Sequence, residues 1–239
     1  MTNDLISIGA ILLMLLVGGG ILGAVQRGGF SFGWLLVAAG LVLLNDALLT
    51  NFYHHGPRLL PPADWNWQGK LLALLGTLLV ASLPAFGWRK SGLTFRQNPQ
   101  GQRSAIIVSI LVCAVFVYFA LKEPNGAIDR ETLAFQLTMP GLEEEPFYRG
   151  ILLLALNEAF RSRANILGIQ LGWGGILSCA VFGLAHAFSY AHGAFHFEPM
   201  AMALTAGSAL ILVWLRERTG SVLLPILLHN FGNSISILI

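Results

Sequence analysis

The sequence predicts an all-α integral membrane protein, a bundle of about eight transmembrane helices that forms a single polytopic domain over residues 1–239. The composition supports this class, because 55% of the residues are hydrophobic and only 11% are charged, whereas soluble domains carry about 25% charged residues. The mean hydropathy is +0.69. In addition, apolar runs of about 18 or more residues recur along the chain, and each can cross a hydrocarbon core of about 30 Å at about 1.5 Å per residue.

The predicted spans are defined by these apolar runs and by the polar stretches between them. The first span follows the residues MTND, which lack the basic segment of a signal peptide, so we expect it to be retained as a helix. The longest polar stretch, Asn51–Lys70, separates the second span from the third, and its Trp65 and Trp67 are typical of an interfacial aromatic belt. The later runs are bounded by short loops rich in arginine, lysine, proline or glycine. In chain order the spans lie near Leu5–Val25, Phe30–Phe52, Leu71–Trp88, Ser104–Leu121, Glu131–Phe160, Ile166–Tyr190, Met200–Leu215 and Ser221–Ile239.

The distribution of charge excludes one class of partner and predicts an orientation. The formal net charge is +2, and no basic block or aromatic-basic pattern typical of nucleic-acid binding occurs. Lysine and arginine are more frequent in the loops after odd-numbered spans, which by the positive-inside rule places those loops in the cytoplasm and both termini outside it. Cys113 and Cys179 lie in apolar spans, where cysteine usually acts as a small hydrophobic residue.

Ionisable residues inside the spans are the strongest functional signal. Such a group costs at least a few kcal/mol in hydrocarbon and usually faces the interior of a bundle. Asp46 in the second span is one example, and it is either an interhelical hydrogen-bond partner or part of a cavity lining. The larger concentration lies on spans five, six and eight, which we expect to carry the site. It consists of Glu143, Glu144, Glu145, Arg149, His186, His229 and Asn233.

Helical spacing sorts these residues into faces. Glu145 and Arg149 are four residues apart with the acid first, the orientation that favours a salt bridge on one helix face. Glu144 points about 100° away from Glu145 and can face another neighbour. Pro146 removes a backbone donor and predicts a kink. Three helices can converge on one polar pocket, because two further pairs share a face at a spacing of four, Phe182 with His186 and His229 with Asn233.

Three short motifs occur in these spans: EEPFYR at 144–149, FGLAH at 182–186 and HNFGN at 229–233. In order and spacing they resemble the motifs of the CAAX-processing endopeptidase and bacteriocin-processing enzyme family of intramembrane proteases. The resemblance covers the motif-bearing part, about residues 131–239, whereas the first four spans are supported by hydropathy alone. Arg149 sets the register, because pairing Glu143 with Glu144 would place Tyr148 where the family has arginine. Glu143 is then an additional acid, expected as polar lining or near an interface.

The resemblance implies an all-helical membrane endopeptidase in which a glutamate activates water. The residue types agree with this chemistry, because amide hydrolysis needs a base for the water and donors for the developing negative charge. By resemblance the catalytic residues are Glu144 as general base, Glu145 and Arg149 as its supporting pair, His186 as the residue that helps to orient and activate water, and His229 and Asn233 as stabilisers of the oxyanion.

A metal ion is not required in this interpretation, but zinc is kept as an alternative. No HExxH sequence occurs, which removes the usual arrangement of two zinc-binding histidines and a base on one helix. Glu144, His186 and His229 are nevertheless ligand types that a catalytic zinc accepts, and some members of the family are named metalloproteases. His192 and His196 also have a ligand-like spacing, but we interpret them as residues of a solvated loop.

Two other functions are compatible with buried charge. A proton- or solute-coupled transporter would use Glu144, Glu145, Asp46 and the histidines as a relay, although such transporters often contain internal repeats and none is visible here. A catalytically silent binding or immunity protein would leave the desolvation cost of the motif residues uncompensated. The protease interpretation implies a peptide or protein substrate at the lipid bilayer, either prenylated or of the leader type. The short loops favour a bacterial plasma membrane.

Overall fold

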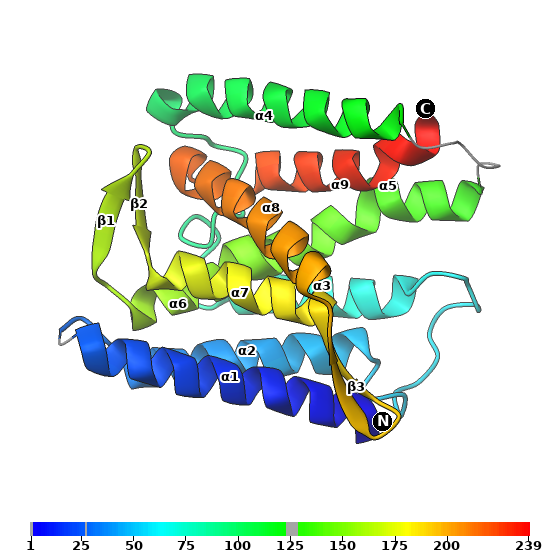
Figure 1. Cartoon of the computed structure of the whole chain (residues 1–239), viewed down its shortest axis with the longest axis horizontal. Coiled ribbons are helices and arrows are strands. Elements are labelled where there is room, and N and C mark those ends of the chain that lie inside the picture. The colour runs from blue at the N-terminus through cyan, green and yellow to red at the C-terminus, as the bar shows by residue number, and fades with distance from the viewer. Residues whose placement is uncertain (1, 27, 123–128) are drawn as a thin grey trace.

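The computed structural model describes residues 2–26, 28–122 and 129–239, which form a helical bundle with two small β-hairpins (Figure 1). The all-α class predicted from the sequence is confirmed. The N-terminal part contains α1 (Thr2–Gln26), α2 (Phe32–Leu49), α3 (Trp67–Ser82) and α4 (Pro99–Ala120). The C-terminal part contains α5 (Arg130–Glu145), the π-helical segment η1 (Pro146–Leu152), α6 (Leu153–Ala159), β1 (Arg163–Ile166), β2 (Ile169–Gly172), α7 (Trp173–Ala187), β3 (Phe188–Ala191), β4 (Ala194–Phe197), α8 (Pro199–Thr219) and α9 (Leu223–Leu238).

Capping residues determine where several helices begin and end. Ser31, Asn66 and Asn98 precede α2, α3 and α4, and each side chain accepts a hydrogen bond from a backbone N–H of the first turn. Asp129 caps α5 in the same way, at a distance of 2.7 Å. Gly220, with φ of 72°, supplies the left-handed residue that ends α8. The helix boundaries thus follow from short polar signals in a largely apolar chain.

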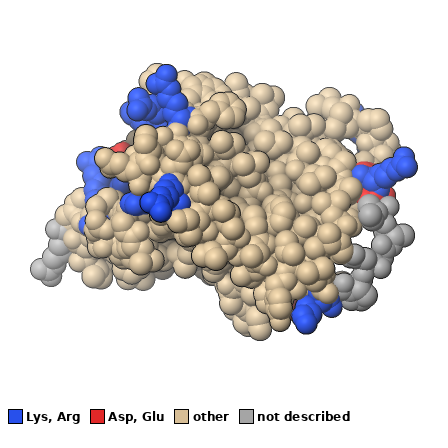
Figure 2. All heavy atoms as spheres, turned by 90° about the horizontal axis from the view of Figure 1, so that it is seen from above, with Lys and Arg blue, Asp and Glu red and all other residues tan. Residues whose placement is uncertain are grey.

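The surface of the bundle is that of an integral membrane protein. Among the described residues, four helices are long and apolar enough to cross a membrane, namely α1, α2, α4 and α8. Large apolar side chains such as Leu13, Ile110 and Leu204 are exposed on them, which is suited to contact with lipid. Figure 2 shows lysine and arginine toward the two ends of one face, with an uncharged surface between them. The number of spans stays a prediction, because α3, α7 and α9 are apolar but shorter.

The fifth predicted span, Glu131–Phe160, is one continuous helical path made of three segments. It comprises α5, η1 and α6, and the π-helical segment begins at Pro146. A proline leaves a carbonyl of the preceding turn without its usual donor, and a π-helical segment is one way in which a helix accommodates this. All 7 residues of η1 are buried. The irregularity predicted at Pro146 therefore lies at the centre of the molecule.

The sixth predicted span, Ile166–Tyr190, is wrong in its extent. Only Trp173–Ala187 is helical, and an antiparallel hairpin stands on each side of this helix. Both hairpins turn through two residues with positive φ, Leu167–Gly168 (51° and 78°) and His192–Gly193 (52° and 80°), as expected for the tightest type of hairpin turn. His192 thus occupies a turn, as the interpretation as a loop residue predicts, whereas His196 has an exposed position on the strand β4.

The helices of the two parts of the chain meet around η1. In Figure 1, α5 runs beside α9, and α7 crosses α8. The N-terminal helix α3 packs against both α5 and η1, while α2 packs against α6 and η1. Residues at the end of α5 can therefore contact side chains from α3, α7 and α9.

Candidate active site

Three adjacent glutamates at the end of α5 differ in their accessibility. The side chains of Glu143 and Glu145 are completely buried, whereas that of Glu144 is 12% exposed. Glu143, expected as polar lining or near an interface, is enclosed by protein on all sides. Glu144 is thus the acid of this group with a partly exposed side chain.

Glu145 links η1 to α9. Its Oε1 lies 3.2 Å from Arg149 Nη1 and 2.6 Å from His229 Nδ1. The ion pair predicted from the spacing of Glu145 and Arg149 is thus confirmed. Arg149 is only 1% exposed, and its guanidinium carbon lies 4.2 Å from the ring centroid of Phe182. A carboxylate and an aromatic face together compensate this buried cation.

The contact with Glu145 orients the ring of His229. Because Nδ1 is hydrogen-bonded to Glu145, the other ring nitrogen, Nε2, faces Glu144, whose Oε2 is 3.6 Å away. Glu144 Oε2 has no hydrogen bond to any of the described residues. Both side chains are 12% exposed. An unpartnered, buried carboxylate oxygen and an imidazole nitrogen therefore lie next to each other within the cluster.

Lys70 completes the cluster, and the sequence analysis did not identify it as a site residue. Its Nζ lies 2.7 Å from Glu143 Oε2 and 2.5 Å from Glu144 Oε1, and its side chain is 13% exposed. The sequence pattern places Lys70 at the end of the polar stretch Asn51–Lys70, whereas α3 begins three residues before it, at Trp67. The charge count could have revealed it, because three carboxylates and one arginine in apolar helices require a further cation.

His186 and His229 lie on either side of Phe182. The ring centroid of Phe182 is 4.5 Å from that of His186 and 6.2 Å from that of His229. His186 is exposed, and its Nδ1 is bonded to the carbonyl of Phe182 at 2.8 Å, which leaves Nε2 free. The helix faces predicted for α7 and α9 therefore point toward a common region.

Two asparagines of the HNFGN motif occupy different environments. Asn233 is exposed and makes no hydrogen bond within the described part of the chain. Asn230 is buried, accepts a hydrogen bond from the N–H of Gly141 at 2.7 Å and donates one to the carbonyl of Thr138 at 3.1 Å. Pro140 interrupts the regular hydrogen bonding of α5 here. Asn230, which the sequence analysis did not single out, thus fastens α9 to α5.

Each of the three alternative metal ligands contacts a protein group through one atom and keeps a second polar atom without a hydrogen bond to any described residue, namely Glu144 Oε2, His186 Nε2 and His229 Nε2. Glu144 Oε1 contacts the ammonium of Lys70, His229 Nδ1 contacts a carboxylate, and His186 Nδ1 contacts a backbone carbonyl. Over residues 2–26, 28–122 and 129–239, no three His, Cys, Asp or Glu side chains are grouped to hold a metal ion.

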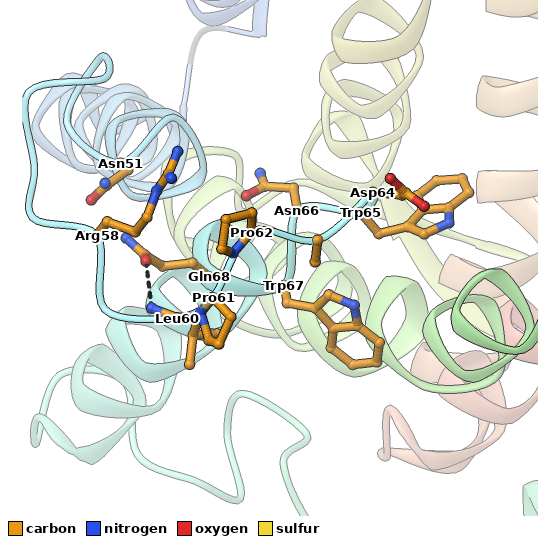
Figure 3. Close-up of a pocket in the computed structure, with 11 residues that line it drawn as sticks. Asn51, Arg58, Leu60, Pro61, Pro62, Asp64, Trp65, Asn66, Trp67 and Gln68 are labelled. Carbon is orange, nitrogen blue, oxygen red and sulfur yellow. Dashed lines mark hydrogen bonds between the residues drawn. The ribbon is translucent and has the colours of Figure 1, made fainter.

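A cavity of about 360 Å³ lies outside this cluster, in the connection between α2 and α3. Figure 3 shows that Arg58, Pro61, Pro62, Trp65 and Trp67 surround it. The two tryptophans do more than face an interface, since both rings pack on Phe135 of α5. Trp65 and Trp67 thus help to seat the α2–α3 connection on the helix that carries the glutamates.

The comparison with protein families agrees with the motifs. Residues 131–235 match the family described as type II CAAX prenyl endopeptidase Rce1-like. No curated protein and no solved structure matches the chain. The matched segment includes every catalytic residue named in the sequence analysis and excludes Lys70. The part of the chain that carries the three motifs thus matches the family that the resemblance indicated.

Proposed function

We propose that the protein is an intramembrane endopeptidase that hydrolyses a peptide bond of a membrane-associated or lipid-modified peptide. One observation carries the proposal. Glu144 is the accessible member of three adjacent glutamates, and its unpartnered Oε2 faces His229 Nε2 at 3.6 Å. A base for water and a group that can stabilise negative charge are therefore neighbours in a largely buried site.

The proposed reaction begins with a water bound beside Glu144 Oε2. Glu144 accepts a proton from this water, and the oxygen attacks the carbonyl carbon of the peptide bond. The carbonyl oxygen becomes an oxyanion, to which Asn233 donates from its side-chain amide and His229 from Nε2 when both ring nitrogens carry protons. Glu144 then passes its proton to the leaving nitrogen, the carbon–nitrogen bond breaks, and a carboxyl and an amino terminus are released.

The remaining motif residues support these groups. Glu145 holds His229 through Nδ1 and is itself paired with Arg149, so the imidazole cannot rotate freely. His186, with Nε2 free and its ring against Phe182, helps to orient the water. Fixed geometry of this kind is a large part of enzymatic rate enhancement, since a displacement of about 1 Å can cost about 10²-fold.

Metal independence is part of the proposal. The ammonium of Lys70 lies 2.5 Å from Glu144 Oε1 and supplies positive charge where a bound metal would otherwise be needed. We expect purified protein in detergent to keep its peptidase activity after treatment with a chelator. A stoichiometric metal that is lost together with activity, and restores it when added back, would contradict this.

The substrate class follows from the family and from the membrane surface. The matched family is named for prenyl endopeptidases, and large apolar side chains are exposed on the long apolar helices of the bundle. We therefore propose a lipid-modified or membrane-bound peptide, in a bacterial plasma membrane, as the substrate. Two probes, a prenylated C-terminal peptide and an unmodified leader peptide, distinguish a lipid-modified substrate from an unmodified one.

The decisive experiment compares the wild type with Glu144→Gln. The amide keeps the size of the side chain but cannot accept a proton from water, so turnover of both peptide probes should fall to background while thermal stability in detergent stays near that of the wild type. Mass spectrometry of membrane and secreted peptides should show an uncleaved species in cells that express the variant. Glu198→Gln, the same change at an exposed glutamate, is the matched control and should leave turnover unchanged.

The same variant tests the two alternative functions. A coupled transporter would lose proton-driven uptake in vesicles with Glu144→Gln and show no peptidase activity in either form. A silent binding or immunity protein would show neither activity, and the variant would have no phenotype. Full peptidase activity in Glu144→Gln would refute the proposed role of Glu144.

A further inference from the structure

We propose that Lys70 is a positioning residue for the general base, and that the buried Glu143 holds Lys70 in place. This inference rests on the proposed function, but it adds a residue from α3, outside the matched segment and outside the three motifs. It assigns a role to Glu143, which the motif pattern leaves without one. Lys70 acts through Glu144 and is not itself expected to touch the substrate.

Glu143 is an acidic residue whose side chain has no exposed surface. A carboxylate with a completely buried side chain is strongly unfavourable unless it is paired. Its Oε2 lies 2.7 Å from Lys70 Nζ, and no other salt bridge to Glu143 occurs within the described residues. Glu143 therefore serves as the fixed anchor of the lysine.

The ammonium of Lys70 forms a bridge between Glu143 and Glu144. Glu143 and Glu144 are consecutive, so their side chains leave the helix about 100° apart. One ammonium contacts both, at 2.7 and 2.5 Å, and must lie between the two directions. This position fixes Oε1 of Glu144 on the side of α3. Oε2 is thereby directed to the opposite side, where His229 Nε2 lies.

The other charged groups of the site do not hold the Glu144 side chain through a hydrogen bond in the described part of the chain. Glu145 is occupied by Arg149 and His229, and Glu144 Oε2 accepts no hydrogen bond from the described residues. Lys70 is thus the group that restrains the long, flexible side chain of Glu144. Of the three lysines of the sequence, Lys90 and Lys122 are exposed and only Lys70 lies within the bundle.

The inference predicts a specific kinetic pattern for the variants. Lys70→Met keeps most of the side-chain volume but removes the ammonium, and kcat should fall by about 10 to 100-fold with little change in KM. Lys70→Arg should recover part of the loss, because its guanidinium can contact both carboxylates. Lys122→Met removes an exposed lysine and should behave as the wild type.

Glu143 provides a double-mutant test. Glu143→Gln should lower kcat, because the anchor of Lys70 is weakened. If Glu143 acts only through Lys70, the double variant Lys70→Met with Glu143→Gln should have a kcat no lower than Lys70→Met alone. If the losses in kcat multiply in the double variant, the two residues act independently. This result would contradict the proposal that Glu143 acts by holding Lys70 in place.

A second measurement does not depend on peptidase activity. Lysines of the purified protein are acetylated with acetic anhydride and followed by mass spectrometry. Lys90 and Lys122 should react rapidly and Lys70 slowly, and Lys70 should react faster in Glu143→Gln. If Lys70 of the wild type were acetylated as fast as Lys90, this would contradict the contact of Lys70 with Glu143 and Glu144.

The two measurements separate this inference from the proposed function. If Glu144→Gln abolishes turnover but Lys70→Met retains the kcat of the wild type, the proposed function stands and the positioning role fails. If Lys70 is protected from acetylation but neither the wild type nor Glu144→Gln cleaves either peptide probe, the bridge stands as a structural contact, the proposed function fails, and the positioning role fails with it.

Discussion

The N-terminal and C-terminal parts of the chain both bury acidic residues, but in different surroundings. On α2, Asp46 lies near Tyr53, in the turn that follows its own helix, and near Asp4. Burial, together with the nearby Asp46 carboxylate, raises the pKa of Tyr53 to about 12, so this residue stays a neutral hydroxyl. At the end of α5, by contrast, the glutamates contact residues of α3, η1 and α9.

This difference shows which buried charges mark a site. A charged residue in an apolar helix is often functional, yet Asp46 and Glu144 both satisfy that description from the sequence. What separates them is convergence, since the groups around Asp46 come from one end of the bundle, whereas those around Glu144 come from distant segments. The predictions below test whether the cluster on α5 depends on this convergence.

The largest effect in this comparison is expected from Glu145→Gln. Arg149 would lose its carboxylate partner at a position where both side chains are at most 1% exposed. Breaking a buried ion pair typically destabilises a protein by about 3–5 kcal/mol, and His229 would lose the group that orients it. We expect a lower midpoint of thermal unfolding in detergent as well as lower turnover.

Glu158→Gln is the matched control for Glu145→Gln. It breaks an i,i+3 pair with Arg161 in which both side chains are at least 40% exposed, and such surface pairs contribute about 0–1 kcal/mol. Equal destabilisation by the two variants would mean that the pair with Arg149 is no more important than a surface contact.

A smaller and purely kinetic effect is expected from Asn233→Ala. The side chain is exposed and makes no hydrogen bond within the described ranges, so unfolding in detergent should be near normal. Loss of one oxyanion donor lowers the catalytic rate by about 10² to 10³-fold. Single-turnover kinetics with the peptide probe would measure this, and an unchanged rate would remove Asn233 from the reaction.

The smallest effect is expected from Asp46→Asn. If Asp46 stands apart from the α5 cluster, kcat should stay within about twofold of the wild type, as for independent, well-separated sites. A transporter that used Asp46 as part of a proton relay would instead lose coupled uptake. Measuring both activities in the same reconstituted vesicles distinguishes these outcomes.

The sequence contained enough information for the class of the protein and for most of the cluster. Apolar runs gave the helices, and a spacing of four gave the Glu145–Arg149 pair, because helix geometry is local. The hairpins around α7 were missed because their turns are Leu-Gly and His-Gly rather than the stronger Asn-Gly or Asp-Gly signals. Their apolar strands extended the hydrophobic run.

The contribution of Lys70 could not be located from local pattern alone. Glu143 and Lys70 are far apart in the sequence, and their contact depends on how α3 packs against α5. The same applies to Asn230, whose partner Gly141 belongs to another helix. Spacing rules describe residues on one helix, whereas these contacts depend on the relative depth and rotation of two helices.

The fastening of α9 to α5 limits one kind of motion in particular. The N–H of Gly141 and the side chain of Asn230 meet at 2.7 Å, and a Cβ at Gly141 would lie only 2.6 Å from Asn230 Oδ1. Glu145 is four residues after Gly141, which is about 6 Å along the axis of α5. On α9, His229 directly precedes Asn230. Axial sliding of the two helices would therefore break the Asn230 hydrogen bonds as it separated Glu145 from His229. Splaying of the far ends of these helices about a pivot near Gly141 would change that distance far less than sliding would, so this contact restricts sliding more than it restricts splaying.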